Sequence, residues 1–242
     1  MTDRTCIKFV MPAEAGIHHR SFQAAKQKMD SGVRRNDGSK YNNQGLPAPV
    51  MSHNPIQRFK DLLTQAEKLG IELPNAFALA TSGDDQESTV RMVLLKEIDE
   101  HGLVFYTNLQ SRKARQITEN PHASACFWWP QLKRQVRFEG RVELVSEQDA
   151  DAYFASRPRG SQIAAWASPQ SSELASRQQL LDAVAAMTEK FKDQRVPRPP
   201  YWSGYRLRSD RMEFWKEQPD RLHERDVYTR QIDGWKFALL AP

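Results

Sequence analysis

The chain has 242 residues, 39% of them hydrophobic, which is enough for a buried core in one large or two small domains. Its formal net charge is +5, but residues 1–50 hold eight basic and four acidic residues, leaving 27 basic and 26 acidic residues in the remainder. A nearly balanced body argues against a nucleic-acid-binding protein, and no apolar run or secretory signal indicates a membrane protein. Cys6 and Cys126 match no metal-ligand spacing, so the default expectation is a globular cytoplasmic protein without a metal.

Residues 1–50 show neither a helical nor a strand period and are rich in Gly, Asn, Ser and mixed charge, which predicts disorder. The segment 11–38 also resembles the peptide obtained when a dispersed bacterial intergenic repeat is translated. We therefore expect residues 1–50 to be a disordered or non-native extension. Met51 is then the expected natural start, and residues 51–242 are expected to form a single domain.

Beyond Pro55 the apolar residues fall at helical spacing up to a stop at Gly70. Further helices are predicted after Ser111, after the capping-box pair of Ser146 and Asp149, and over residues 172–192. The predicted strands span residues 75–81, 88–97, 102–107, 123–129, 134–145, 202–208, 211–217, 226–230 and 234–239. Many short strands, few helices and no GxGxxG or P-loop favour an antiparallel barrel over a dinucleotide-binding fold.

Several cations lie within or beside apolar stretches. Arg91 and Lys96 bracket MVLL, Arg112 and Lys113 open a helix, and Arg157 and Arg159 flank a proline. Arg and Lys side chains, helix N-termini and aromatic walls are what a phosphorylated aromatic ligand needs. Any one of these cations taken alone is more simply a solvated charge.

The segment RMEFWKEQPDRLHER, residues 211–225, resembles the signature of the pyridoxamine 5'-phosphate oxidase family. Four further segments occur in the family's order, and the chain ends in GWKFALLAP as family members typically do. The resemblance extends from about residue 56 to the C-terminus. The supporting segments are RMVLLK (91–96), VFYTNLQSRKARQI (104–117), RQVRFEG (134–140) and SRPRGSQIAAWASPQSS (156–172).

The resemblance implies a mainly β fold, the FMN-binding split β-barrel with Greek-key connections and flanking α-helices. It also implies a homodimer with FMN in clefts between the subunits. The implied reaction is oxidation of pyridoxamine or pyridoxine 5'-phosphate to pyridoxal 5'-phosphate, by hydride transfer from the 4' carbon to the flavin. Dioxygen is the implied acceptor and hydrogen peroxide the product, and neither nucleic acid nor a membrane is an expected partner.

The resemblance also assigns roles to individual residues. Arg221 and His223 are the implied catalytic pair, one clamping the substrate ring and the other hydrogen-bonding a ring substituent. The implied substrate-binding residues are Lys96, Tyr153, Arg157, Ser161, Arg221, Leu222 and His223. The implied FMN-binding residues are Arg91, Met92, Val93, Leu94, Leu95, Lys96, Tyr106, Thr107, Arg112, Lys113, Gln135, Gln170, Ser171, Trp215 and Arg225.

Two residues depart from the family pattern. Lys216 follows Trp215 where the family usually has Gln, His or Gly, which suggests an added cation near the flavin, and Ala164 stands where Gly is common. Two rival functions stay open. One is a split-barrel flavoenzyme acting on another ring, such as a phenazine precursor, although Tyr153, Arg157 and Ser161 would form a phosphate site that it does not need. The other is a non-catalytic FMN- or pyridoxal-phosphate-binding protein.

Overall fold

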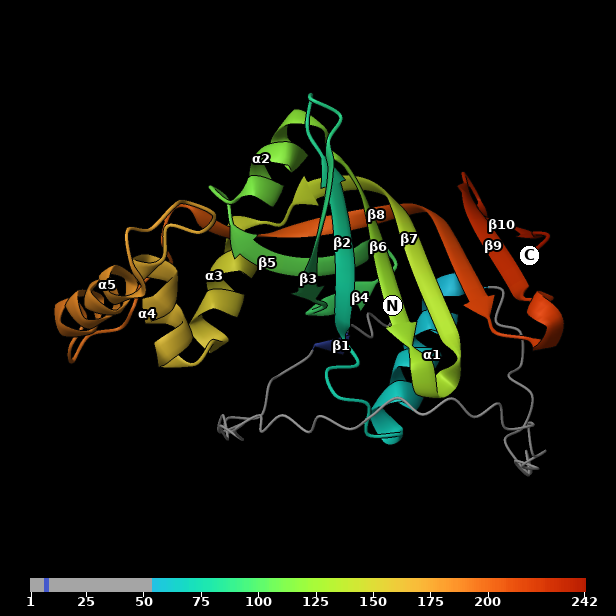
Figure 1. The fold of residues 1–242 in the computed structure, drawn as a ribbon, viewed down its shortest axis with the longest axis horizontal. Helices are drawn as coiled ribbons and strands as arrows, with labels where there is room; N and C mark the ends of the chain where they lie inside the picture. Colours follow the sequence, from blue (N-terminus) through green and yellow to red (C-terminus); the bar gives the residue numbers. More distant parts are fainter. Residues whose placement is uncertain (1–6, 9–53) are drawn as a thin grey trace, which may run out of the picture. The chain divides into compact units, whose positions relative to one another are not determined.

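The computed structural model describes residues 7–8 and 54–242, and within them one antiparallel sheet carries five α-helices (Figure 1). The predicted extension, residues 1–50, lies outside the described residues except for β1. The strands are β1 (Ile7–Lys8), β2 (Ala76–Ser82), β3 (Ser88–Leu94), β4 (Glu97–Asp99), β5 (Gly102–Asn108), β6 (His122–Trp129), β7 (Arg134–Leu144), β8 (Trp202–Lys216), β9 (Glu224–Gln231) and β10 (Gly234–Leu239). The helices are α1 (Pro55–Lys68), α2 (Arg112–Glu119), α3 (Glu147–Ser156), α4 (Arg159–Ala167) and α5 (Arg177–Lys190), with 3-10 turns at Pro130–Leu132 and Pro219–Arg221.

The sheet follows the order β1-β4-β5-β8-β7-β6-β2-β3, and β9 and β10 extend it from the far half of β8. β8 is the organising strand. Its first part pairs with β5, its last part pairs with β9, and β7 runs along most of its length. Residues near the two ends of β8 therefore face different surroundings, with α3–α5 at one end and the β9–β10 hairpin at the other (Figure 1).

Three of the predicted strands have wrong boundaries. The strand predicted over 88–97 is broken, because β3 pairs with β2 whereas β4 pairs with β5, and the chain crosses between them at Leu95 and Lys96. There Leu95 N donates to Asn75 O at 2.8 Å, and Lys96 N donates to Val104 O at 2.9 Å. The strands predicted over 202–208 and 211–217 are one strand, β8, which continues past Asp210 through a register shift against β7.

Most of the predicted helices are confirmed. α1 is confirmed, and Gly70 beyond its end has φ +67°, a conformation that glycine adopts without strain. α3 begins as predicted, since Asp149 N donates to Ser146 Oγ at 3.1 Å. α5 lies within the predicted 172–192, but α4 was not predicted, because its short apolar pattern between Pro158 and Pro169 gives a weak periodic signal.

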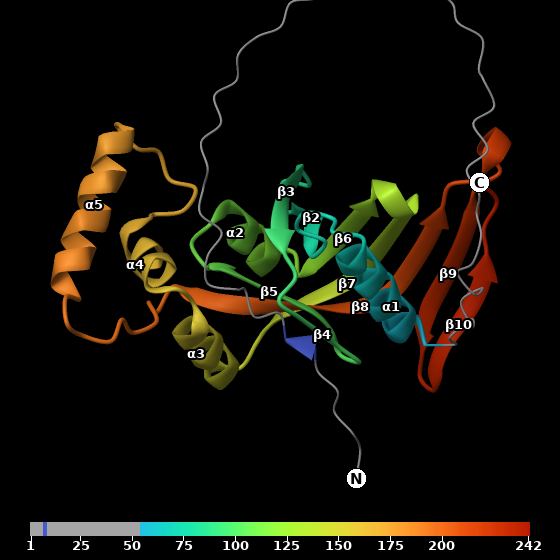
Figure 2. The ribbon, with the colours of Figure 1, turned by 90° about the horizontal axis from the view of Figure 1, so that it is seen from below.

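The core lies between α1 and the sheet (Figure 2). Phe59 of α1 makes edge contacts with Phe127 of β6 and Phe138 of β7, with ring centroids 4.8 and 4.9 Å apart. A smaller apolar cluster joins α3, α4 and the segment after α5 to Trp202 at the start of β8. This second cluster supports the helices that carry several of the predicted substrate-binding residues.

Candidate active site

A buried lysine marks the first part of the site, which we call the α2 cluster: Arg91, Thr107, Arg112, Lys113 and Gln170. Lys113 Nζ donates to Thr107 Oγ1 at 3.0 Å, to Gln170 Oε1 at 3.0 Å and to Ser111 Oγ at 3.2 Å. All three acceptors are neutral, and the ion pair of this cluster, at 3.6 Å, joins Glu87 to Arg112 rather than to Lys113. Burial, and then the charge of Arg91, lower the pKa of Lys113 to about 8. A bound anion would supply the missing counter-charge.

Ser111 occupies the N-cap position of α2, as predicted, but its hydroxyl does not cap the helix. It accepts the hydrogen bond from Lys113 instead. The first N–H groups of α2 are therefore not satisfied by a capping side chain, and N–H groups of this kind bind phosphate oxygens at helix N-termini.

Arg91 is held in place by neighbours that the sequence did not single out. Its Nη1 donates to Thr81 Oγ1 at 2.6 Å and to Leu79 O at 3.1 Å, and its Nη2 donates to Thr89 Oγ1. Both threonine hydroxyls also bond Gln116 Oε1 at 2.7 Å. Polar residues of this ordinary kind in strands and helices carry no pattern by which the sequence could have identified them.

The second part, the α3 cluster, comprises Lys96, Tyr106, Tyr153, Arg157 and Trp202. The rings of Tyr106 and Tyr153 stack with centroids 3.9 Å apart, and Trp202 lies parallel to both. Tyr106 can lie flat across β8 only because Gly204 has no side chain, since a Cβ there would be 2.6 Å from the tyrosine ring. Burial raises the pKa of Tyr153 to about 12, so its hydroxyl stays a proton donor at neutral pH.

Two buried polar atoms of the α3 cluster have no hydrogen-bond partner among the residues that the structure describes. The guanidinium of Arg157 lies 4.7 Å from the Trp202 ring, and its buried Nη1 has no hydrogen-bond partner among the residues that the structure describes. The hydroxyl of Tyr106 is also buried without a hydrogen-bond partner among the described residues. Burial, and then the charge of Arg157, lower the pKa of Lys96. An anion bound here would balance the charges of Lys96 and Arg157 and would accept a hydrogen bond from Arg157 Nη1. Ser161 follows in the first turn of α4.

The third part, the β8 cluster, comprises Gln135, Trp215, Arg221, His223 and Arg225. Gln135 and Arg225 are the cross-strand partners of Trp215, and the His223 ring lies 4.6 Å from the Trp215 ring. Gln218 N donates to His223 Nδ1 at 3.2 Å, which leaves Nε2 to carry the proton in the neutral ring.

Arg221 of this cluster is exposed, and so is its neighbour Leu222. Arg221 has φ +63° and follows Asp220 at φ +55°, so two successive residues adopt the left-handed conformation. A turn of this kind is strained for residues other than glycine and is frequent where a loop serves a site. Lys216 projects to the other side of β8 from Trp215, where its Nζ pairs with Glu224 at 3.4 Å. Its charge is thus partnered on the face of β8 that points away from Trp215.

The α2 and β8 clusters do not meet within one chain. Arg91 is paired with the fully buried Leu79, and paired residues point to the same face, so Arg91 projects from the core face of the sheet. Trp215 follows the buried Phe214 and projects from the opposite face together with Gln135.

Distance along β8 separates the clusters as well. Thr107, which contacts Lys113, pairs with Ser203, whereas Trp215 lies near the other end of the strand, about 40 Å further along it. One ligand that touches all the predicted flavin-binding residues therefore requires a second chain.

Among residues 54–242, His, Cys, Asp and Glu side chains nowhere gather in threes at a spacing suited to a metal ion. In the same range no helix combines the length and hydropathy that a membrane span requires.

Comparison with known proteins shows two family models in tandem. "Pyridoxamine 5'-phosphate oxidase" matches residues 63–191, and "Pyridoxine 5'-phosphate oxidase C-terminal dimerisation region" matches residues 202–242. A pyridoxine/pyridoxamine 5'-phosphate oxidase of Myxococcus xanthus is 50% identical over 201 residues, covering 81% of this chain and 98% of the relative. A pyridoxine/pyridoxamine 5'-phosphate oxidase of Rubrobacter xylanophilus is 44% identical over 212 residues, which cover 88% of this chain and 96% of that relative.

Among solved structures, PhzG from Burkholderia lata 383 in complex with tetrahydrophenazine-1-carboxylic acid superposes with a TM-score of 0.76 at 32% identity, over 81% of this chain and 98% of PhzG. An FMN-binding protein of Nostoc punctiforme related to pyridoxamine 5'-phosphate oxidase has a TM-score of 0.63 at 19% identity, over 79% of this chain and 100% of that protein. At this identity the likeness shows the fold alone. The predicted fold, a mainly β split barrel of the FMN-binding type, is confirmed.

Proposed function

Because this chain belongs to the pyridoxamine 5'-phosphate oxidase family, we propose that it oxidises pyridoxamine 5'-phosphate and pyridoxine 5'-phosphate to pyridoxal 5'-phosphate. Bound FMN would supply the hydride acceptor, with dioxygen as the final oxidant and hydrogen peroxide as its product. The observation that carries the proposal is the presence of two separate cationic sites, the α2 and α3 clusters, each deficient in anionic partners. A reaction between two phosphorylated ring compounds needs two such sites.

The α2 cluster is suited to the phosphate of FMN. Lys113 and Arg112 would contact it together with the N–H groups at the start of α2, and Arg91 is already fixed by its threonine neighbours. Gln135, across from Trp215, offers both a donor and an acceptor to the polar edge of a flavin ring. The backbone of residues 91–96, Tyr106 and Ser171 complete the flavin site that we propose.

The α3 cluster is suited to the phosphate of the substrate. Lys96 and Arg157 provide positive charge, and the hydroxyls of Tyr153 and Ser161 can donate hydrogen bonds. Arg221 and His223 would then orient the substrate ring, with the His223 Nε2–H as the donor to a ring substituent. These side chains bind and orient, and none is required as a strong base.

We further propose a homodimer in which each site combines the α2 and α3 clusters of one chain with the β8 cluster of its partner. Support comes from the opposite faces of Arg91 and Trp215 and from the match of residues 202–242 to a dimerisation region. Apolar side chains that are exposed in the single chain, Val90, Met92 and Trp128, would be covered in such an assembly.

The direct test is an absorbance spectrum of the purified protein, followed by addition of pyridoxamine 5'-phosphate without oxygen. We expect a flavin spectrum that bleaches on addition and recovers with peroxide formation when air is admitted. A bound flavin that does not respond would favour the rival suggested by the likeness to PhzG, an enzyme for another ring, or a binding role. A protein that binds no FMN would refute the proposal.

The pKa of Lys113 makes FMN affinity dependent on pH. The free ammonium loses its proton near pH 8, and the protonated form binds a phosphate dianion better, so the Kd for FMN is expected to rise above that pH. The rise can reach about tenfold per pH unit, measured by flavin fluorescence quenching on the apoprotein. A Lys113→Met variant should bind weakly at every pH and lack this step; a wild-type Kd that is flat from pH 7 to 10 would contradict the assignment.

A further inference from the structure

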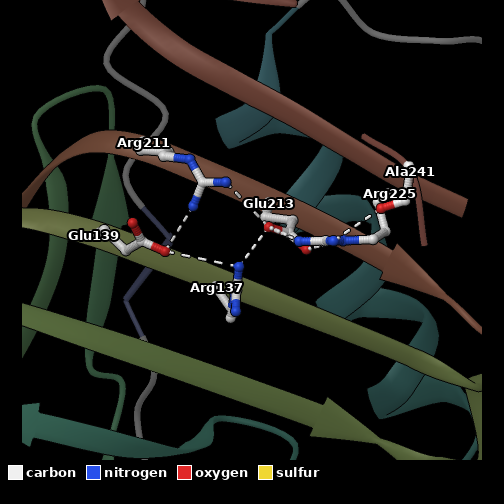
Figure 3. Close-up of polar contacts among 6 residues, drawn as sticks. All are labelled: Arg137, Glu139, Arg211, Glu213, Arg225 and Ala241. Carbon is white, nitrogen blue, oxygen red and sulfur yellow. Dashed lines mark hydrogen bonds and ion pairs between the residues drawn. The ribbon is translucent and has the colours of Figure 1, made fainter. Parts of the chain in front are cut away.

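Glu213 is a buried carboxylate in the middle of an arginine cluster (Figure 3). Its side chain is only 2% exposed and accepts hydrogen bonds from three strands: Arg137 of β7, Arg211 of β8 and Arg225 of β9. Burial alone would raise the pKa of Glu213, but the hydrogen bond from Arg225 and the charges of Arg137 and Arg225 lower it. Glu213 is therefore ionised at neutral pH.

The guanidinium of Arg225 is held by hydrogen bonds to Glu213 and to Ala241. Its Nε donates to Glu213 Oε1 at 2.9 Å and its Nη2 donates to Glu213 Oε2 at 3.2 Å, a two-point contact that fixes the plane of the guanidinium. Its Nη1 donates to Ala241 O at 3.0 Å, and Leu240 N donates back to Arg225 O at 2.9 Å. Three of the five N–H bonds of the guanidinium are thus used inside the protein, and the others are left for a ligand.

The second carboxylate of the cluster behaves differently. Glu139 accepts from Arg211 at 2.8 Å and lies 3.9 Å from Arg137, but it makes no contact with Arg225. Because it shares two arginines with Glu213 and carries the same charge, Glu139 is a matched control for any general electrostatic effect of the cluster.

We infer that Glu213, together with the carbonyl of Ala241, is the clamp that holds Arg225 in its flavin-binding orientation, so that a buried acid and the C-terminal residues belong to the flavin site. The inference rests on the proposed role of Arg225. A free arginine side chain loses considerable rotamer entropy when it binds a ligand, and the clamp removes that loss in advance. Glu213 is a positioning residue and does not itself need to touch the flavin.

The test measures FMN affinity in full-length apoprotein by fluorescence quenching. Glu213→Gln is expected to weaken binding about tenfold to a hundredfold, because the charge that aligns Arg225 is lost. Glu139→Gln should stay within about twofold of the wild type. If Glu213 acts through Arg225, the double variant Glu213→Gln with Arg225→Lys will bind no more weakly than Arg225→Lys alone.

Additive losses in the double variant, or equal losses for Glu213→Gln and Glu139→Gln, would overturn the clamp. Should Glu213→Gln fail to fold, Glu213→Asp keeps the charge but shortens the reach, and we expect the same loss of affinity. The Nε–H nuclear magnetic resonance signal of Arg225 in the flavin-free protein gives a separate reading: slow solvent exchange in the wild type and fast exchange in Glu213→Gln. That signal tests the clamp even if the wild type proves not to bind FMN, which would refute the proposed function alone.

Discussion

An Arg157→Ala variant is expected to lose affinity for pyridoxamine 5'-phosphate while keeping its affinity for FMN. A hydrogen bond between charged groups contributes about 1.5–3 kcal/mol, so the KM should rise by about tenfold to 150-fold. The effect is confined to one ligand because Arg157 belongs to the α3 cluster, beside Lys96 and Trp202, and makes no contact with the α2 cluster. Steady-state kinetics and FMN titration of the same preparations provide the two measurements.

Arg159 is the matched control for this variant, since it lies on the other side of Pro158 and carries the same charge. Its guanidinium donates to Phe191 O and to Gln194 O, contacts that tie α4 to the end of α5. Arg159→Ala should therefore lower the unfolding temperature without changing the KM. Equal losses of FMN and substrate affinity in Arg157→Ala would contradict the assignment of the α3 cluster to the substrate phosphate.

Activity at low substrate concentration is expected to be partly restored when two impaired variants are mixed. Arg157→Ala disables the α3 cluster and Arg221→Ala disables the β8 cluster, but a dimer containing one chain of each has one site built from two intact halves. With random pairing, the mixture should recover about one quarter of wild-type activity, because half the dimers are mixed and each mixed dimer has one good site. Unfolding and refolding the two variants together, followed by an oxidase assay, measures this recovery.

The control for mixing is a pair of variants in the same cluster, Arg157→Ala with Lys96→Met. Every site in that mixture has one damaged α3 cluster, so no recovery is expected. If Arg157→Ala and Arg221→Ala recover nothing although mixed dimers form, each site lies within one chain and the proposed arrangement is wrong. Recovery in both mixtures would mean that Lys96 and Arg157 of one chain do not serve the same site.

Much of the fold followed from local pattern. The stop of α1 at Gly70 and the start of α3 at Ser146 were predicted from helix-ending and capping residues, whose effects act over one turn. The break at Leu95 was not predicted, and the break predicted near Asp210 does not exist, because the choice of partner strand decides where a strand ends. Leu95 continues an apolar run in sequence, yet its neighbours on either side pair with different strands.

The candidate site, too, could be predicted from the sequence only in part. The signature at 211–225 and the motifs around Arg91, Lys113 and Arg157 placed the chain in its family, which the comparisons confirm. Their individual roles stay predictions. Glu213 stood within the signature as an acidic residue in an apolar strand, a signal that could have marked it, but its partners Arg137 and Arg225 lie on other strands and only pairing brings them together.

The sequence by itself determined the fold class, the family and the residue types available for two phosphates, because periodicity, capping and short motifs are properties of neighbouring residues. Only the tertiary structure decided which of these residues share a face. In a sheet, successive side chains alternate between faces and neighbours come from distant segments, so Arg91 and Trp215 fall on opposite sides of one chain. That geometry is the reason why the site that we propose needs a second chain.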